Sequence, residues 1–390
     1  MRKLHCYFDY AATTPVDPKV VKAMQPYFFD IFGNPASVHS YGQAALRAVD
    51  TARQVIADFL GCPPLAVIFT AGATESNNLA LQGLLAPGQH LITTTIEHPS
   101  VLEVCQALEK TGLEVSYIGV DAEGLVKSAD ILAAIKKNTA LISVMYVNNE
   151  IGTIEPITEI GAGLKVINQQ RRQNNLAPVY FHTDAVQAAF YCNLKVNDLG
   201  VDLLSLSGHK IYGPKGIGVL YRRQAVPLRP VLRGGPQEFG LRPGSLNTAA
   251  IVGLAQAVRL IADQVKHDQT VKRIQGLRDE IKSGVKKILP AVKVNGTVER
   301  RVAGNLSLSF SQADAEALLI QLDQAGIAVS VGSACSAGSL APSPVLGAIG
   351  LKPDLARGTI RISLGKFNNY RQVQYFLKTL ALVLKNQTNR

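Results

Sequence analysis

The sequence predicts an α/β fold in which a mostly parallel central sheet is flanked by helices, with a smaller α+β domain beside it. The 390 residues are 47% hydrophobic and 18% charged, so the chain can bury a sizeable core, which excludes intrinsic disorder. Between residues 60 and 225, short apolar runs alternate with segments of helical period. These runs lack the strict alternation of half-exposed strands, which is typical of a buried parallel sheet.

The predicted strands of the larger domain are short apolar runs bounded by turn residues. We expect them at residues 66–70, 90–94, 113–120, 140–147, 179–182, 202–205 and 218–221. Two helices are expected between them, at residues 74–85 and at residues 99–110, the second of which ends before Gly112. Right-handed crossovers bring the carboxyl ends of parallel strands to the same edge of the sheet.

The last third of the chain predicts a separate α+β layer, reached through one long Lys-rich helix at residues 256–288. Further strands are expected at residues 306–310, 327–331 and 359–364, with helices at residues 313–324 and 370–385. The polar segment 168–178 is expected to be an exposed loop. We therefore expect a large cofactor-binding domain over residues 15–264 and a small domain formed by residues 1–14 and 265–390.

Composition excludes several classes of protein. No apolar run approaches the ~20 residues of a membrane span, and Asp9 precedes any apolar stretch, so no signal peptide is expected. The five scattered cysteines contain no C-x-x-C pair, which favours reduced thiols in the cytoplasm over disulfides or zinc. The net charge of +11 permits nucleic acid as a partner, but the basic residues are spread out and no recognition motif accompanies them.

Polar residues come directly after several of the predicted strands. In open parallel sheets, ligands bind at these carboxyl ends of the strands. Residues 72–74 begin a helix, whose free N–H groups suit a phosphate, although Thr74 could be an ordinary helix cap. His98, Asp184 and Lys210 each follow another strand. The histidine and the aspartate could each be structural, but a lysine among glycines at a strand end is harder to explain as surface. Together they suit pyridoxal phosphate, with Lys210 forming a Schiff base and Asp184 keeping the pyridine nitrogen protonated.

Two residues of the last third also carry possible chemistry. Cys335 lies in the middle of a run of small residues, 331–339, which favours an exposed, nucleophilic thiol over a buried one. Arg361 lies inside an apolar strand. It either faces solvent at a sheet edge or binds a substrate carboxylate through two hydrogen bonds.

Six motifs, in the same order, resemble those of the cysteine desulfurases and extend over nearly the whole chain. They are YAATTP at 10–15, FGNPAS at 32–37, GATES at 72–76, VNNEIG at 147–152, SGHK at 207–210 and GSAC at 332–335. The long segment around Cys335 is similar to that of the group that serves iron–sulfur cluster assembly.

The resemblance implies a pyridoxal phosphate-dependent transferase fold type I, of the class-V aminotransferase kind, working as a homodimer with sites near the subunit interface. It implies that Lys210, His98 and Cys335 are catalytic, with His98 stacked on the cofactor ring. It implies further cofactor-binding residues at Ala73, Thr74, Asp184, Gln187, Ser207, His209 and, for the partner subunit's phosphate, Ser245. Asn149 and Arg361 match the residues on the carboxylate side of the substrate. No metal is expected.

The implied reaction converts L-cysteine to L-alanine and leaves the sulfur on Cys335 as a persulfide. The sulfur would then pass to acceptor proteins, such as an iron–sulfur scaffold. Selenocysteine lyase or another pyridoxal phosphate-dependent C–S lyase is the nearest alternative, and a basic nucleic-acid-binding protein is the alternative from a different class. A transaminase has no need of Cys335.

The sequence also departs from the family pattern. Residues 242–245 are RPGS where relatives often have RSGT, and residues 234–239 lack the usual histidine. The printed chain ends at Arg390 without the longer tail that some relatives use to dock a scaffold, which leaves the docking mode open.

Overall fold

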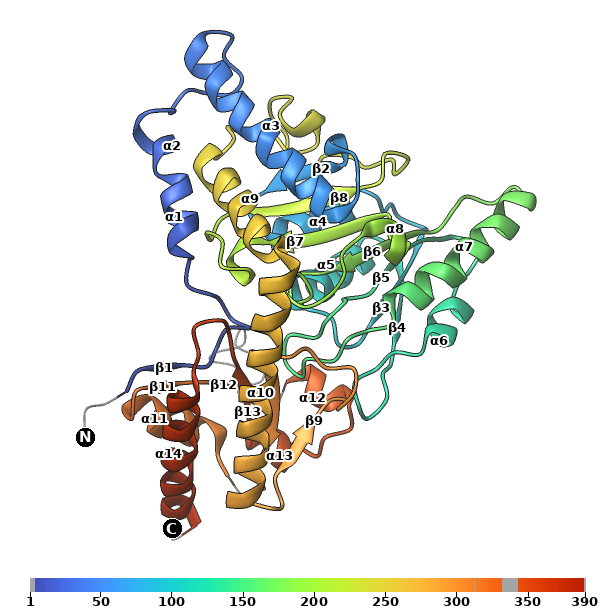
Figure 1. Ribbon diagram of the computed structural model, residues 1–390. Helices are drawn as coiled ribbons and strands as arrows, with labels where there is room; N and C mark the ends of the chain where they lie inside the picture. The colour runs from blue at the N-terminus through green and yellow to red at the C-terminus, as the bar shows by residue number, and fades with distance from the viewer. Residues whose placement is uncertain (1–3, 312, 332–342, 389–390) are drawn as a thin grey trace.

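The computed structural model describes residues 4–311, 313–331 and 343–388. Figure 1 shows a larger layered domain and, below it, a smaller domain that carries both termini, with the long helix α10 leading from one toward the other. The expected α/β class, with a mostly parallel sheet and a smaller α+β unit, is confirmed.

In the described residues the larger domain contains a seven-stranded sheet with the order β2-β8-β7-β6-β5-β3-β4. Its pairs are parallel except for those of β8, which is antiparallel to both β2 and β7. The strands are β2 (Val67–Thr70), β3 (His90–Thr94), β4 (Glu114–Ile118), β5 (Thr139–Ser143), β6 (Tyr180–Asp184), β7 (Leu203–Ser207) and β8 (Gly218–Arg222).

Alternate strand residues face opposite sides of this sheet, and each side has its own core. Val67, Phe69 and Leu204 belong to a core shared with α3, α7 and α9, whereas Ile68 and Leu203 belong to one shared with α4 and α5. The helices of this domain are α1 (Pro18–Met24), α2 (Pro26–Phe29), α3 (Ser40–Leu60), α4 (Ala73–Gln82), α5 (Pro99–Glu109), α6 (Ser128–Ala133), α7 (Ile157–Gln173), α8 (Val196–Leu199) and α9 (Thr248–Ala262). Three 3₁₀ turns are η1 (Pro64–Ala66), η2 (Gly208–Lys210) and η3 (Glu238–Gly240).

The described part of the smaller domain has an antiparallel sheet with the order β12-β13-β10-β9 and a short parallel pair, β1 with β11. Its strands are β1 (Cys6–Tyr7), β9 (Lys293–Asn295), β10 (Asn305–Ser309), β11 (Ile327–Ala328), β12 (Ser330–Val331) and β13 (Thr359–Ser363). Its helices are α10 (Gln264–Ile288), α11 (Ala315–Gln324), α12 (Pro344–Ala348), α13 (Pro353–Arg357) and α14 (Tyr370–Thr388).

Three sequence-based expectations about elements are wrong. The single helix expected over 256–288 is two helices, α9 and α10, which meet at Asp263 and are bent by 80°. Part of the expected loop 168–178 is helical, because α7 continues to Gln173 and Arg171 is buried there. Its guanidinium donates to the carbonyls of Ala177, Lys136 and Lys137, which compensates for the burial of its charge. The strand expected at 327–331 is divided between β11 and β12, which belong to different sheets.

Within the described residues, no single helix has the length and apolar composition needed to cross a membrane; α9 and α10 meet those criteria only when taken together as a bent pair.

Candidate functional site

The strand ends that were expected to carry the site border one cavity of about 1220 Å³, which we call the cleft. Its walls come from the ends of β6 and β7, the first turns of α4 and α5, the segment after β5, and β13. The candidate residues that line it are Ala73, Thr74, His98, Asn149, Asp184, Gln187, Ser207, His209, Lys210 and Arg361.

Lys210 lies in the 3₁₀ turn that directly follows β7, so the end of that strand places its side chain in the cleft. Its Nζ donates to the carbonyl oxygens of Ala11 (2.5 Å) and Ala12 (2.9 Å). Gln187 Nε2 donates to the same Ala11 oxygen at 2.9 Å. The N-terminal segment therefore holds the lysine amine inside the cleft, where an aldehyde could reach it.

Asp184 is the last residue of β6, and it is only 6% exposed. Its Oδ2 accepts a hydrogen bond from Asn77 Nδ2 at 2.8 Å, and its Oδ1 accepts one from Val186 N at 3.0 Å. His182, two residues earlier on the same strand, is fully buried, and burial lowers its pKa to about 4, so it is neutral. The Asp184 carboxylate is therefore fixed in orientation and has no cation among these neighbours. A carboxylate in this state can pair with a protonated ring nitrogen.

His98 is the N-cap of α5, because its Nδ1 accepts a hydrogen bond from Ser100 N at 3.1 Å. An Nδ1 that accepts leaves the proton of a neutral imidazole on Nε2. The helix cap thus fixes the ring and its tautomer. Pro99 at the first helical position is compatible with this start, because that position needs no N–H donor.

The phosphate side of the cleft is the beginning of α4. Gly218 on β8 allows the close approach of Gly72, because a Cβ at Gly218 would lie 2.7 Å from the Gly72 Cα. The first turn of α4 carries free backbone N–H groups and the positive end of the helix dipole. His209 nearby is neutral, since burial and the charges of Lys210 and Lys215 lower its pKa to about 4. This arrangement suits a phosphate group.

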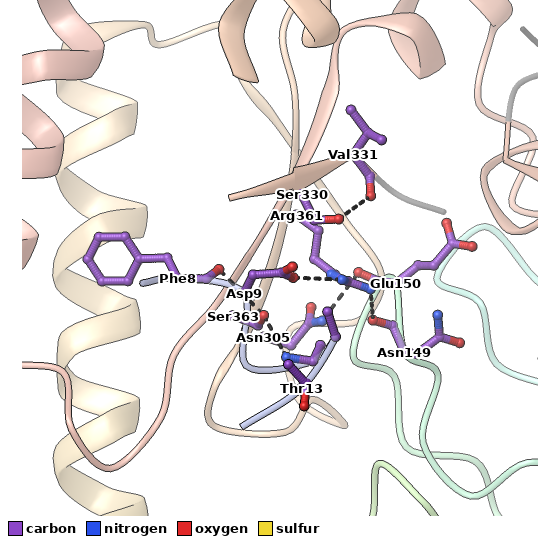
Figure 2. Close-up of polar contacts among 12 residues, drawn as sticks. Phe8, Asp9, Thr13, Asn149, Glu150, Asn305, Ser330, Val331, Arg361 and Ser363 are labelled. Carbon is purple, nitrogen blue, oxygen red and sulfur yellow. Dashed lines mark hydrogen bonds and ion pairs between the residues drawn. The ribbon is translucent and has the colours of Figure 1, made fainter. Parts of the chain in front are cut away.

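Arg361 on β13 is 2% exposed and lies between two other segments of the chain (Figure 2). Its Nη2 forms an ion pair with Asp9 Oδ1 at 2.8 Å, and its Nη1 donates to the backbone oxygen of Asn149 at 3.1 Å. Because Arg361 pairs inward and lines the cleft, the interpretation as a solvent-facing edge residue is wrong. A buried, positioned guanidinium of this kind suits a substrate carboxylate.

Comparison with known proteins agrees with this geometry. The chain matches the family model of aminotransferase class-V over residues 6–376. It is 42% identical over 387 residues to "Cysteine desulfurase IscS" of Dictyoglomus turgidum (strain DSM 6724 / Z-1310), covering 98% of this chain and 95% of that one. It is also 43% identical to "Cysteine desulfurase" of Homo sapiens, covering 95% of this chain and 79% of the relative.

The chain belongs to the class-V aminotransferase family, among its cysteine desulfurases. Solved structures agree. One described as "NIFS-LIKE PROTEIN" matches with a TM-score of 0.90 and 35% identity over 98% of this chain and 100% of its own. Another, described as "SspA in complex with cysteine", matches with a TM-score of 0.78 and 38% identity, covering 93% of this chain and 100% of its own.

Several residues of this cysteine desulfurase site were not assigned a role from the sequence. Asp9, Ala11 and Ala12 belong to the N-terminal segment that holds Arg361 and Lys210, and Asn77 holds Asp184. Ala11 and Ala12 belong to the YAATTP motif, so the motif pointed to them. However, they accept the hydrogen bonds of Lys210 through backbone oxygens, and a sequence motif does not show which backbone oxygens accept.

Two buried glutamates beside the cleft were also missed. Burial raises the pKa of Glu97 to about 8, although its carboxylate accepts hydrogen bonds from Thr94 Oγ1 and Met145 N. Burial likewise raises the pKa of Glu150, whose Oε2 accepts a hydrogen bond from Ser343 Oγ at 2.5 Å. Both line the cleft, and Glu97, with a pKa of about 8, is mostly protonated at neutral pH and adds little negative charge there.

Cys335 lies outside the described residues. The four described cysteines are all free, and burial raises the pKa of each thiol: to about 11 for Cys6 and Cys62 and to about 12 for Cys105 and Cys192. Because the thiolate is the nucleophile, none of these four is suited to attack sulfur at neutral pH.

Ser245 is exposed and is not among the residues that line the cleft. Its expected role at the phosphate of a partner subunit stays a prediction. Among the described residues, no cluster of three or more histidines, cysteines or acidic residues could hold a metal ion.

Proposed function

We propose that this chain is a pyridoxal 5′-phosphate-dependent cysteine desulfurase, which converts L-cysteine to L-alanine and transfers the sulfur to Cys335. The convergence of Lys210, Asp184 and Arg361, from three separate segments, on one cleft carries the proposal. A relative described as a complex with cysteine supports the substrate.

The residues of the cleft fit the cofactor. The first turn of α4, Ser207 and His209 would hold its phosphate, Asp184 its pyridine nitrogen, and Gln187 its ring hydroxyl. Lys210 would hold its aldehyde carbon, and His98 would stack on its ring. The fixed Asp184 carboxylate and the glycine-dependent approach of α4 are the observations that fit this group best. When bound, the cofactor withdraws electrons from the substrate and makes its Cα proton acidic.

The residues of this chain would then divide the work. The Arg361 guanidinium binds the carboxylate of L-cysteine and orients the amino acid, with Asn149 beside it. The Lys210 amine accepts the Cα proton and returns it, and the Nε2–H of His98 supplies a second proton-transfer group. The Cys335 thiolate attacks the substrate sulfur, so that an S–S bond forms as the C–S bond breaks. The electron pair of the C–S bond stays with carbon, which takes a proton and leaves as L-alanine.

We further propose that the enzyme is a homodimer that passes its persulfide sulfur to acceptor proteins, including an iron–sulfur scaffold. An exposed aromatic patch, formed by Phe28, Phe29, Phe32 and Tyr41, supports a partner copy. The four free thiols support a reducing compartment, the cytoplasm.

The purified protein with added pyridoxal phosphate should show a visible absorbance band. With a dithiol reductant present to release the persulfide sulfur, L-cysteine should yield alanine and sulfide in equal amounts. Cys335→Ala should keep the band but form neither persulfide nor sulfide. Lys210→Ala should lose the band of the lysine-bound cofactor. Cys62→Ala, which changes a thiol outside the cleft, is the matched control and should retain full activity.

A protein that stays colourless with the cofactor, or a Cys335→Ala variant that releases sulfide at the normal rate, would refute the assignment. Rates measured with L-selenocysteine distinguish a cysteine desulfurase from a selenocysteine lyase. A selenocysteine lyase would show a far higher kcat/KM for that substrate than for L-cysteine.

A further inference from the structure

A second cavity lies outside the cleft, between α10 and the edge strand β9 of the smaller domain. It has a volume of about 440 Å³, and we call it the α10–β9 groove. Figure 1 shows β9 beside the lower half of α10. The helix contributes positions three and four apart, which form one face; they are Gln275, Arg278, Asp279, Lys282, Ser283 and Lys286.

The groove is strongly basic. Arg278, Lys282 and Lys286 come from α10, and Arg301 faces them from the segment that joins β9 to β10. Among the residues that line the groove, Asp279 is the one acidic residue, and it pairs with Arg278 Nε at 2.9 Å. Because the Asp279 side chain is half exposed, this pair is partly screened by solvent. At least three positive charges are left without an acid in the groove.

Arg301 is held rigidly by neutral acceptors. Its Nε donates to the Thr297 carbonyl at 2.9 Å, its Nη1 to the Ile151 carbonyl at 2.8 Å, and its Nη2 to the Asn295 carbonyl. These bonds fix the plane of the guanidinium but do not neutralise its charge. A side chain that is already ordered loses little entropy when it binds a ligand.

The two guanidinium groups also repel one another. Burial, followed by the charge of Arg278, lowers the pKa of Arg301 to about 10, although Glu123 acts in the opposite direction. Arg278 is itself only 7% exposed. A buried cation and a partly buried one that disfavour each other are both stabilised by an anion bound in the groove that they line.

We propose that the α10–β9 groove binds a small oxyanion of the phosphate type, either free phosphate or a phosphate monoester. Arg278 donates through Nε to Asp279 and through Nη1 to the Val302 carbonyl, so among the described residues its Nη2 is left to donate to an oxyanion. Arg301, Lys282 and Lys286 add positive charge around it. A cavity of this size suits a small molecule better than an acidic protein surface or a nucleic acid. The site is separate from the cleft, so it stands or falls independently of the proposed function.

The test uses the cofactor-loaded enzyme, so that the phosphate subsite at α4 is filled, in a constant chloride background. Inorganic phosphate and glycerol phosphate are titrated separately by calorimetry. The variant Lys282→Gln/Lys286→Gln removes two charges from the groove. The matched control Lys272→Gln/Lys287→Gln removes two exposed lysines of the same helix that do not line it.

Wild type and control should bind one phosphate per chain, and the groove variant should bind at least about tenfold more weakly, a loss of about 1.4 kcal/mol. Saturating phosphate should raise the melting temperature of wild type and control but not of the groove variant. The ligand that binds more tightly identifies the natural class, ion or ester. Absence of binding to wild type, or equal affinities in the groove variant and the control, would overturn the site.

Discussion

Asp9 forms an ion pair with Arg361, which lines the cleft and whose side chain is almost fully buried (Figure 2). Arg361 has a second partner in the Asn149 carbonyl, and its Nε is buried without a hydrogen-bond partner among the described residues. Asp9 therefore fixes the plane of the guanidinium through one strong, charge-assisted bond. Within the proposed function, Asp9 is a positioning residue, since it acts on the substrate through Arg361.

Asp9→Asn should raise the KM for L-cysteine by about tenfold while kcat changes much less. A hydrogen bond between charged groups contributes about 1.5–3 kcal/mol, and a tenfold change corresponds to about 1.4 kcal/mol. Steady-state kinetics measure the split between KM and kcat. Asp50→Asn, at an exposed position on α3, is the control and should leave both unchanged. A lower KM in Asp9→Asn would show instead that Asp9 competes with the substrate carboxylate.

The functional side chains could be predicted from the sequence only where their position depends on nearby elements of the chain. Lys210, Asp184 and His98 could be found because each lies at the end of a strand or shortly after it, and strand ends meet at one edge of a parallel sheet. Asp9 could not be found in this way, because its partner Arg361 lies 352 residues away. Only the folded chain, in which β1 joins the smaller domain, brings them together.

At the scale of elements, the strands were predictable where apolar runs end at turn residues. The run at 90–94 coincides with β3, and the other strands of the large sheet differ from their predicted limits by a few residues. The break at Asp263 was not predictable, because no proline or glycine interrupts the helical pattern there. Packing sets the bend: α9 packs on α3 of the larger domain, and α10 packs on α14 of the smaller one.

A buried glutamate, Glu238, anchors the segment that joins β8 to α9 through hydrogen bonds to two other parts of the chain. Glu238 accepts two hydrogen bonds from Arg53 (2.9 and 2.6 Å) and one from Phe69 N (2.7 Å). Glu238 and Phe239 have φ angles of +46° and +61°, which are unfavourable for residues with side chains. The ion pair compensates for this strain and holds the segment that leads to Ser245.

Glu238→Gln should lower the free energy of unfolding by about 3 kcal/mol, because it leaves the buried Arg53 charge without its counter-ion. Urea denaturation followed by circular dichroism measures the loss. Asp354→Asn removes the partner of Arg357 in a pair whose side chains are 70% and 90% exposed, and it should cost less than about 0.5 kcal/mol. Similar small losses in both variants would contradict the importance of the buried pair.

At the scale of the whole molecule, one surface region carries four exposed aromatic side chains. Phe28, Phe29 and Phe32 are 56%, 79% and 65% exposed, and Tyr41 is 57% exposed, in the segment from α2 to the beginning of α3. Phe32 and Tyr41 pack on each other, with ring centroids 5.5 Å apart. Contiguous exposed aromatic side chains mark a surface that another protein covers. In the proposed homodimer, a second copy covers it.

Replacing Phe29 and Phe32 with serine should therefore shift the dimer toward monomer, because the interface would lose two of its largest apolar side chains. Sedimentation velocity at micromolar concentration should show a dimer for wild type and mostly monomer for the double variant. Val166→Ser/Leu382→Ser is the matched control, since both residues are 54–58% exposed but lie on α7 and α14, away from the patch. The control should remain dimeric. A wild-type protein that sediments as a monomer, or a Phe29→Ser/Phe32→Ser variant that remains fully dimeric, would show that a second copy of the chain does not depend on this aromatic patch.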